Sequence, residues 1–223
     1  MSKKIYISPS NQSGNLYATG NTNEKVQCHK IAKACVNYLK KAGFNVKCTY
    51  NDDMYVRVKE SNAFGADMHI AIHTNATSKH NVTGGAQILL YSVSDERKKA
   101  GQAVLDYLAP LTPGKSAERL VAKPDFYECN STKGLCVYCE CEFHDTKVGS
   151  DFIIKNTTAI GEAIAKGVCK YYGVALLKQN NAPSKNGTLY TVQVGAFAVK
   201  ENAQKQLEAL KKAGFKGFIT EKI

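Results

Sequence analysis

The sequence predicts an α/β protein, an open sheet in three layers with helices on both faces, followed by a small strand-helix-strand unit. Apolar segments of strand length alternate with segments of helical periodicity through the first 174 residues. After Val174 the pattern stops at a polar stretch, residues 177–187, whose proline, glycine and lack of periodicity are typical of a linker. We therefore expect a first domain over 1–175, a linker over 176–187 and a second unit over 188–223.

Each element of the first domain follows from its local pattern. Short apolar or alternating segments predict five strands, at residues 4–8, 44–48, 67–73, 86–91 and 135–143. Helical periodicity predicts four helices, at residues 24–41, 55–64, 94–108 and 151–172. Gly43 and Gly65 follow the first two helices, and glycine suits the left-handed conformation that often ends a helix.

The second unit has its own pattern. Residues 189–197 alternate like a strand, a helix is expected at 201–212, and a further strand at 217–221. A unit of about 36 residues lies below the size that usually folds alone. We expect it to pair with a second copy or to dock on another surface.

Composition limits the function classes. The chain has 30 Lys and Arg against 19 Asp and Glu, a net charge of +11, with 43% hydrophobic and 22% charged residues. These values are typical of a globular protein that is attracted to polyanions such as an anionic cell wall. No segment is apolar for long enough to predict a transmembrane helix. Nucleic acid is not an expected partner, because no recognition motif accompanies the charge.

The cysteines and the N-terminus suggest where the protein is made. No apolar segment with a cleavage site follows Met1, so we expect synthesis in the cytoplasm without a signal peptide and action on the cell wall after release by a holin or by lysis. The eight cysteines are then expected to be free and buried. Cys136 and Cys139 have CxxC spacing, but on a strand they would face opposite sides of the sheet.

Polar side chains gather where the expected strands end. Asn11 and Gln12 follow the first strand, Glu24 opens the first helix, His73 ends the third strand, and Glu140 lies on the last strand. The carboxyl ends of strands in open α/β sheets are where active sites form. Individually, Glu24 also suits a helix N-terminus, and His73 could be an ordinary strand-end histidine.

Together these residues are compatible with a catalytic zinc site. Such a site uses three protein ligands and leaves one position for water, whose pKa falls to about 7. Glu24, His73 and a ligand near residue 11 or 12 would supply the three. A carboxylate at Glu140 could take the proton of the water and pass it to a leaving amine. We also expect Asn75 and His144, which lie close to the same strand ends, to contact substrate.

Residues 1–174 resemble the zinc-dependent N-acetylmuramoyl-L-alanine amidases of the amidase-3 family, of endolysin and autolysin type. The likeness rests on five segments in the family's order and spacing: Ile5-Tyr-Ile-Ser-Pro9, Asn23-Glu24, Ala66 to Ala76, Gly84-Gly-Ala86 and Val137 to Phe143. It implies hydrolysis of the amide between N-acetylmuramic acid and the L-Ala of the stem peptide. It also implies that Glu24 and His73 bind zinc and that Glu140 is the catalytic carboxylate.

The sequence departs from the family at one ligand. Where the family usually has a zinc-binding histidine after the first strand, this chain has Asn11, followed by Gln12. An amide oxygen is a weaker zinc ligand than imidazole. We assign the third position to Gln12, with Asn11 or another side chain as alternatives, and expect the metal to be held weakly. His69, about 13 Å back along the strand from His73, is interpreted as buried or supporting.

The last 36 residues resemble half of a SPOR domain, a module that binds peptidoglycan. Tyr190 to Phe197, Glu201-Asn-Ala203 and Ala213-Gly-Phe215 carry this likeness. Because a full module has two strand-helix-strand units, we predict a homodimer through the tail. The alternative to a hydrolase is a wall-binding protein with a degenerate, non-catalytic amidase fold, which the change at Asn11 favours and the retention of Glu24, His73 and Glu140 opposes.

Overall fold

The computed structural model describes residues 2–51, 53–77, 84–115, 119–177, 193–215 and 217–221. It divides into two compact units, Met1–Leu177 and Lys178–Ile223. The predicted linker over 176–187 lies almost wholly outside the described residues.

The described part of the first unit contains one six-stranded sheet in the order β2-β1-β3-β6-β4-β5. Its strands are β1 (Lys4–Pro9), β2 (Asn45–Cys48), β3 (Met68–Asn75), β4 (Gln87–Leu90), β5 (Arg119–Ala122) and β6 (Leu135–Phe143). β1, β2, β3 and β6 are parallel, whereas β4 runs antiparallel to β6. The carboxyl ends of β1, β3 and β6 therefore meet at one edge of the molecule.

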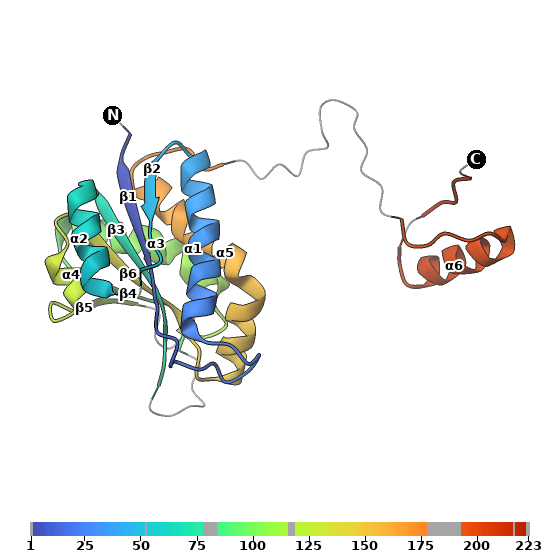
Figure 1. The fold of residues 1–223 in the computed structure, drawn as a ribbon, viewed down its shortest axis with the longest axis horizontal. Coiled ribbons are helices and arrows are strands. Elements are labelled where there is room, and N and C mark those ends of the chain that lie inside the picture. The colour runs from blue at the N-terminus through green and yellow to red at the C-terminus, as the bar shows by residue number, and fades with distance from the viewer. Residues whose placement is uncertain are drawn as a thin grey trace. The chain divides into compact units, whose positions relative to one another are not determined.

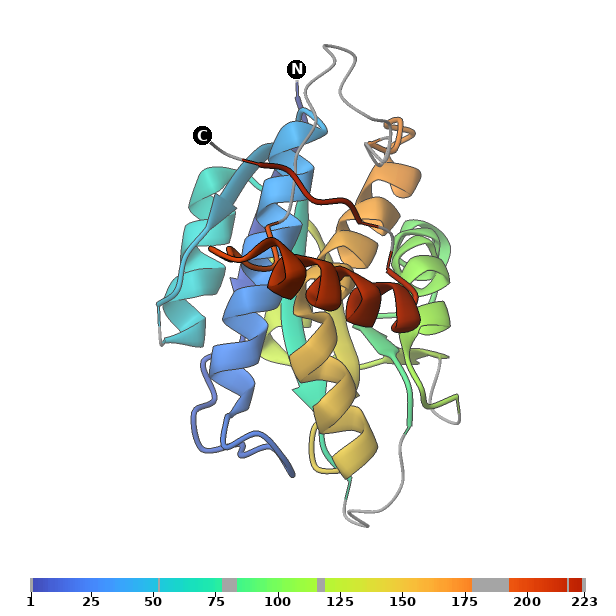
Figure 2. The ribbon, with the colours of Figure 1, turned by 90° about the vertical axis from the view of Figure 1, so that its right-hand side faces the viewer.

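Helices cover both faces of this sheet, as predicted. The helices are α1 (Glu24–Lys41), α2 (Met54–Phe64), α3 (Asp95–Leu108), α4 (Tyr127–Ser131) and α5 (Lys147–Tyr171), with a short 3-10 helix at Ala109–Leu111. Figure 1 shows α2 and α4 on one side of the sheet and α1 and α5 on the other. In Figure 2, α5 lies between α1 and α3.

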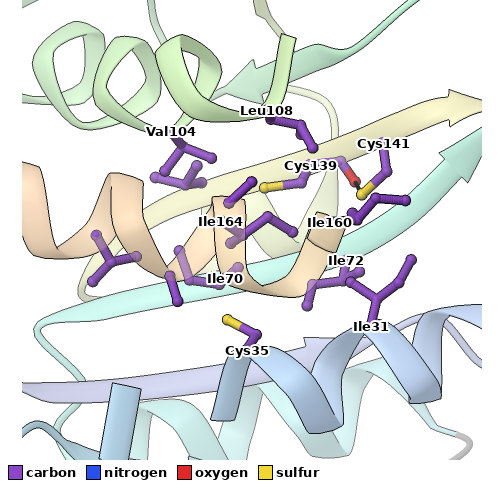
Figure 3. Close-up of a cluster of buried hydrophobic side chains, with 14 of the residues drawn as sticks. Ile31, Cys35, Ile70, Ile72, Val104, Leu108, Cys139, Cys141, Ile160 and Ile164 are labelled. Carbon is purple, nitrogen blue, oxygen red and sulfur yellow. Dashed lines mark hydrogen bonds between the residues drawn. The ribbon is translucent and has the colours of Figure 1, made fainter. Parts of the chain in front are cut away.

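The main core lies between the sheet and the three long helices. Ile70, Ile72 and Cys139 of the sheet meet Ile160 and Ile164 of α5 there (Figure 3). α5 approaches its neighbours closely through two glycines. A Cβ atom on Gly161 would overlap the backbone of α1 at Ile31, and one on Gly167 would overlap α3 at Val104.

A smaller apolar cluster occupies the other face, where Cys136 and Tyr138 of β6 pack with Cys129 of α4. Cys136 and Cys139 thus point to opposite faces of the sheet, as predicted. All eight cysteines are free, but Cys48 is only partly buried, whereas the sequence predicted that all eight are buried. The positive φ angles of Gly43 and Gly65, 92° and 67°, confirm their helix-ending role.

Besides the 3-10 helix at Ala109–Leu111, two elements of the first unit were not predicted, and others differ in length. β5 and α4 are four and five residues long, too short for a periodic pattern to indicate them. α5 begins at Lys147 rather than at residue 151, because Thr146 caps it by accepting a hydrogen bond from the Gly149 amide at 3.0 Å.

The second unit contains α6 (Lys200–Lys212), close to the predicted helix. The predicted strands are wrong for the residues that can be assessed: 193–199 and 217–221 contain no strand, and 189–192 lie outside the described range. An isolated strand leaves its backbone groups unpaired, so these segments need a partner to become a sheet. None of the α6 residues is buried. Within the described ranges, no helix is both long and apolar enough to span a membrane.

Candidate active site at the carboxyl ends of β1, β3 and β6

Four predicted site residues come together where the central strands end. Gln12 lies in the loop after β1, Glu24 is the first residue of α1, His73 lies near the end of β3, and Glu140 on β6 is the register partner of His73. The position of Glu24 is set by Asn23, whose side chain accepts the Val26 amide hydrogen bond at 3.0 Å and so fixes the helix start.

Glu24 and His73 form the centre of the site. Glu24 Oε1 lies 2.9 Å from His73 Nδ1, and both side chains are almost fully buried. The Thr74 amide donates to the same carboxylate oxygen at 3.3 Å, and Asn15 Nδ2 donates to Glu24 Oε2 at 2.6 Å. The ring of Tyr138 stacks on the His73 imidazole at a centroid distance of 4.3 Å, which closes the site from the sheet side.

Gln12, rather than Asn11, reaches this centre. The Gln12 amide nitrogen lies 3.5 Å from His73 Nδ1, and Gln12 Oε1 accepts from Asn15 at 2.8 Å. Asn11 turns away: its Oδ1 lies 2.6 Å from His29 Nε2, and its Nδ2 donates to the Asn51 carbonyl. A half-turn of the Gln12 amide would present its oxygen to the same region as His73 Nδ1.

Glu140 and Glu142 occupy different environments although they are neighbours on β6. Glu140 is partly buried, and among the described residues its Oε2 has no hydrogen-bond partner. Glu142 is fully buried, and its carboxylate accepts from the backbone amides of Gly85, Gly114 and Phe143. Glu142 therefore ties three segments of backbone together, whereas Glu140 has a carboxylate oxygen available for chemistry.

The two predicted substrate contacts differ in accessibility. Asn75 is partly exposed at the end of β3 and donates to Gln87 Oε1 at 3.0 Å. His144 is buried, its ring stacks on Tyr17 at 5.1 Å, and its Nδ1 lies 3.0 Å from the Thr74 carbonyl oxygen. Contact between His144 and a substrate would require this packing to open.

A second buried carboxylate, Glu128 of α4, was missed by the sequence analysis. Its Oε2 lies 3.6 Å from His73 Nε2, and its Oε1 lies 3.1 Å from His69 Nε2. Ser8 Oγ donates to Glu128 Oε1 at 2.5 Å. His69 is fully buried, as interpreted from the sequence. The position of His69 and His73 on one face of the same strand was the only sequence feature that indicated a buried hydrogen-bond partner beside these two rings.

The charges of the site follow from this arrangement. Burial alone would lower the pKa of His73, but the flanking carboxylates of Glu128 and Glu24 outweigh it and raise that pKa to about 10. Burial would raise the pKa values of Glu24 and Glu128, but hydrogen bonds and the nearby histidines hold both below the usual range. For Glu140 burial dominates, with the Glu24 charge adding to it, and raises the pKa to about 7.

These donors fit a metal held by few strong ligands. Glu24 and His73 Nδ1 are a carboxylate and an imidazole facing each other at short range, and Gln12 can add an amide oxygen. Over the parts of the chain that the structure describes, no group of three His, Cys, Asp or Glu side chains is arranged to hold an ion. The fit is therefore to two strong ligands and one weak one.

Comparisons with known proteins agree with this fold. The family model described as N-acetylmuramoyl-L-alanine amidase matches residues 8–170, and the SPOR domain model matches residues 172–221. No curated protein matches the chain in sequence.

Three solved structures illustrate the likeness of fold. An N-acetylmuramoyl-L-alanine amidase from Clostridium difficile 630 is 23% identical with a TM-score of 0.66, over 77% of this chain and 97% of that one. The catalytic domain of an amidase of the same name from Bacillus (Paenibacillus) polymyxa var. colistinus is 18% identical with a TM-score of 0.66, over 78% and 99%. The catalytic domain of an endolysin targeting Clostridia difficile is 23% identical with a TM-score of 0.59, over 76% and 97%.

The first unit is a six-stranded α/β sheet with acidic and imidazole side chains at its strand ends, and one family model matches most of the chain. These findings place the protein among the peptidoglycan hydrolases. The chain belongs to the N-acetylmuramoyl-L-alanine amidase family and carries a SPOR domain, a peptidoglycan-binding module. The predicted fold class, the family resemblance and the hydrolase function are confirmed. Zinc dependence and the roles of individual residues stay predictions.

Proposed function

We propose that the protein is a zinc-dependent amidase that cleaves the bond between N-acetylmuramic acid and L-Ala of the stem peptide. The observation that carries this proposal is the buried Glu24–His73 pair, which lies beside Glu140 at the carboxyl ends of adjacent parallel strands. The family match supports the same reaction.

In this proposal Glu24, His73 and Gln12 bind the zinc ion. When bound, zinc would act as a Lewis acid toward the water and the scissile carbonyl group. Glu24 is held for this role by Asn15 and by the Thr74 amide, which leave its carboxylate one orientation. His73 is held by the stacked ring of Tyr138. Because the third ligand is a neutral amide, we expect zinc to be lost during mild dialysis.

In the proposed reaction Glu140 transfers a proton from the attacking water to the leaving amine. Its Oε2 lacks a hydrogen-bond partner in the described structure, so it can accept a proton from the attacking water and return it to the leaving amine of L-Ala. Glu140 pairs in register with His73, so it lies on the strand next to the proposed ligands. Asn75, partly exposed at the same edge, is proposed to contact the substrate, and His144 is proposed to do so only if it leaves its packing against Tyr17.

The tail is proposed to hold the enzyme on peptidoglycan and to form a homodimer. Several large apolar side chains of this unit are exposed, including Val194, Phe215 and Phe218 at 60%, 64% and 76%. Segments that lack strand partners and expose apolar residues could complete a sheet with a second copy. Light scattering at micromolar concentration tests this directly: a monomeric mass contradicts the dimer, and a dimeric mass that falls on Phe218→Ser substitution supports it.

The test of the amidase function uses the full chain and purified Gram-positive peptidoglycan. Mass spectrometry should detect new L-Ala amino termini that vanish with a chelator and return with zinc. Glu140→Gln should lower the rate by about 10²–10⁴-fold, whereas Glu96→Gln, an exposed substitution of the same kind on α3, should leave it unchanged. Wall binding without new amino termini would favour the alternative, a binding protein with a degenerate site. That alternative is also consistent with a site that has only two strong ligands among the described residues.

A further inference from the structure

His73 lies between two buried carboxylates, and only one of them belongs to the proposed zinc site. Glu24 faces Nδ1 at 2.9 Å, and Glu128 faces Nε2 at 3.6 Å from the opposite side of the ring. A neutral imidazole carries one proton, and the nitrogen that binds a metal must be the one without it. The group facing the other nitrogen therefore decides which nitrogen is available.

The burial of the Glu128 carboxylate is not explained by the short helix that carries it. Its side chain is 1% exposed and comes from a helix of only five residues. Within the described structure its Oε2 and the facing His73 Nε2 are both buried and both lack a hydrogen-bond partner. Two such atoms facing each other at 3.6 Å are slightly beyond hydrogen-bond range, so a small rotation of the ring would join them.

Two groups hold the other oxygen of Glu128, and each of them is held in turn. Ser8 Oγ and His69 Nε2 both contact Oε1, at 2.5 Å and 3.1 Å. Arg57, itself only 3% exposed, donates from Nε to Ser8 Oγ at 2.9 Å. On the far side, His69 Nδ1 lies 3.0 Å from Ser61 Oγ. A buried carboxylate with one oxygen so firmly held leaves the second oxygen pointing at a single group, His73.

We propose that Glu128 is a positioning residue that accepts the Nε2 proton of His73, so that Nδ1, which donates its own proton to Glu24 in the metal-free protein, is the nitrogen that releases its proton to solvent when a metal binds beside Glu24 and Gln12. Metal-binding histidines commonly donate their other ring N–H to a carboxylate in this way. Ser8, Arg57 and His69 hold Glu128 in place. The inference rests on the proposed zinc site, and it assigns that site to one particular nitrogen of His73.

The test compares zinc affinity and ring protonation in the full-length protein and its Glu128→Gln variant. In zinc-loaded protein labelled with ¹⁵N-histidine, NMR should show Nε2 of His73 protonated and Nδ1 bound to metal. In Glu128→Gln the amide must keep its oxygen toward Ser8 and His69, which places its NH₂ group against Nε2. Zinc affinity should then fall about 10–100-fold, and the Nε2 proton signal should shift or disappear.

Controls separate this inference from the proposed function. Glu162→Gln on α5, a partly exposed substitution of the same kind, should bind zinc like the wild type. If Glu128→Gln does not fold, Ser8→Ala, which removes one support of Glu128, should show a smaller loss of affinity. Protonation of Nδ1 instead of Nε2, or unchanged affinity in a folded Glu128→Gln protein, overturns the inference while leaving a zinc amidase in place. Failure of the wild type to bind zinc overturns both.

Discussion

Replacing Gln12 by glutamate tests the weakest part of the proposed zinc site. The Gln12 amide is 3.5 Å from His73 Nδ1 and shares the Asn15 donor with Glu24. A carboxylate at position 12 keeps this donor. One nitrogen of Asn15 lies 2.8 Å from the Gln12 oxygen and 2.6 Å from Glu24 Oε2, so the new negative charge lies within about 5 Å of the Glu24 carboxylate. Two like charges at that distance repel by about 1–3 kcal/mol, the lower value applying in water and the higher near a protein surface.

This repulsion sets the expected loss of stability in the metal-free variant, and the same new charge sets the expected gain in zinc affinity. Without metal, Gln12→Glu should be less stable than the wild type by about 1–3 kcal/mol. The repulsion between the two carboxylates is present before and after zinc binds, so it does not reduce the gain in binding. A divalent ion attracts the new charge about twice as strongly as Glu24 repels it, by about 2–6 kcal/mol, and desolvation of the new carboxylate offsets part of this gain. Zinc affinity should therefore rise by at least about tenfold, at about 1.4 kcal/mol for each factor of ten.

Zinc affinity is measured by competition with a chromophoric chelator. The stability of the metal-free protein is measured by unfolding in urea. Gln12→Leu, which keeps a side chain of similar bulk but removes the amide, should lower zinc affinity. Gln102→Glu makes the same chemical change on α3, away from the site, and should leave zinc affinity unchanged. If Gln12→Glu and Gln12→Leu both bind zinc like the wild type, Gln12 is not a ligand and the reasoning fails.

Two further predictions concern stability and wall binding. Val168→Ala in the core of α5 should destabilise by about 2–3 kcal/mol, from two buried methyl groups and the cavity they leave. Thermal unfolding should show this as a decrease of about 4–12 °C in Tm. The control Val148→Ala changes a valine of the same helix that is 55% exposed, and it should change stability by less than about 0.5 kcal/mol. Equal effects of the two substitutions would contradict the assigned core. Deleting residues 178–223 removes eight lysines and three glutamates, net +5 of the total +11. Co-sedimentation with cell walls should then weaken and lose part of its salt dependence, while soluble-substrate activity persists; undiminished binding would assign wall attachment to the first unit.

Most of the fold followed from local pattern. The helix at Glu24–Lys41 was predicted with its observed bounds because a long periodic segment buries one consistent face. The strand at Leu135–Phe143 was predicted with its observed bounds because a long apolar run is typical of a strand covered on both faces. β5 and α4 were missed because four or five residues contain too little periodicity to distinguish them from loops. The tail strands were predicted from alternation alone, but alternation cannot supply the neighbouring strand that a sheet requires.

The sequence by itself determined the α/β class, the family and the residues at the strand ends, because each depends on residue types at fixed spacing along the chain. Only the tertiary structure decided which amide, Gln12 or Asn11, turns toward His73, because that depends on where His29 and Asn51 lie. It also brought Glu128 to the second nitrogen of His73 from 55 residues further along the chain. A buried carboxylate has no local pattern, since its position is fixed by side chains such as Ser8 and His69 that only folding brings to it.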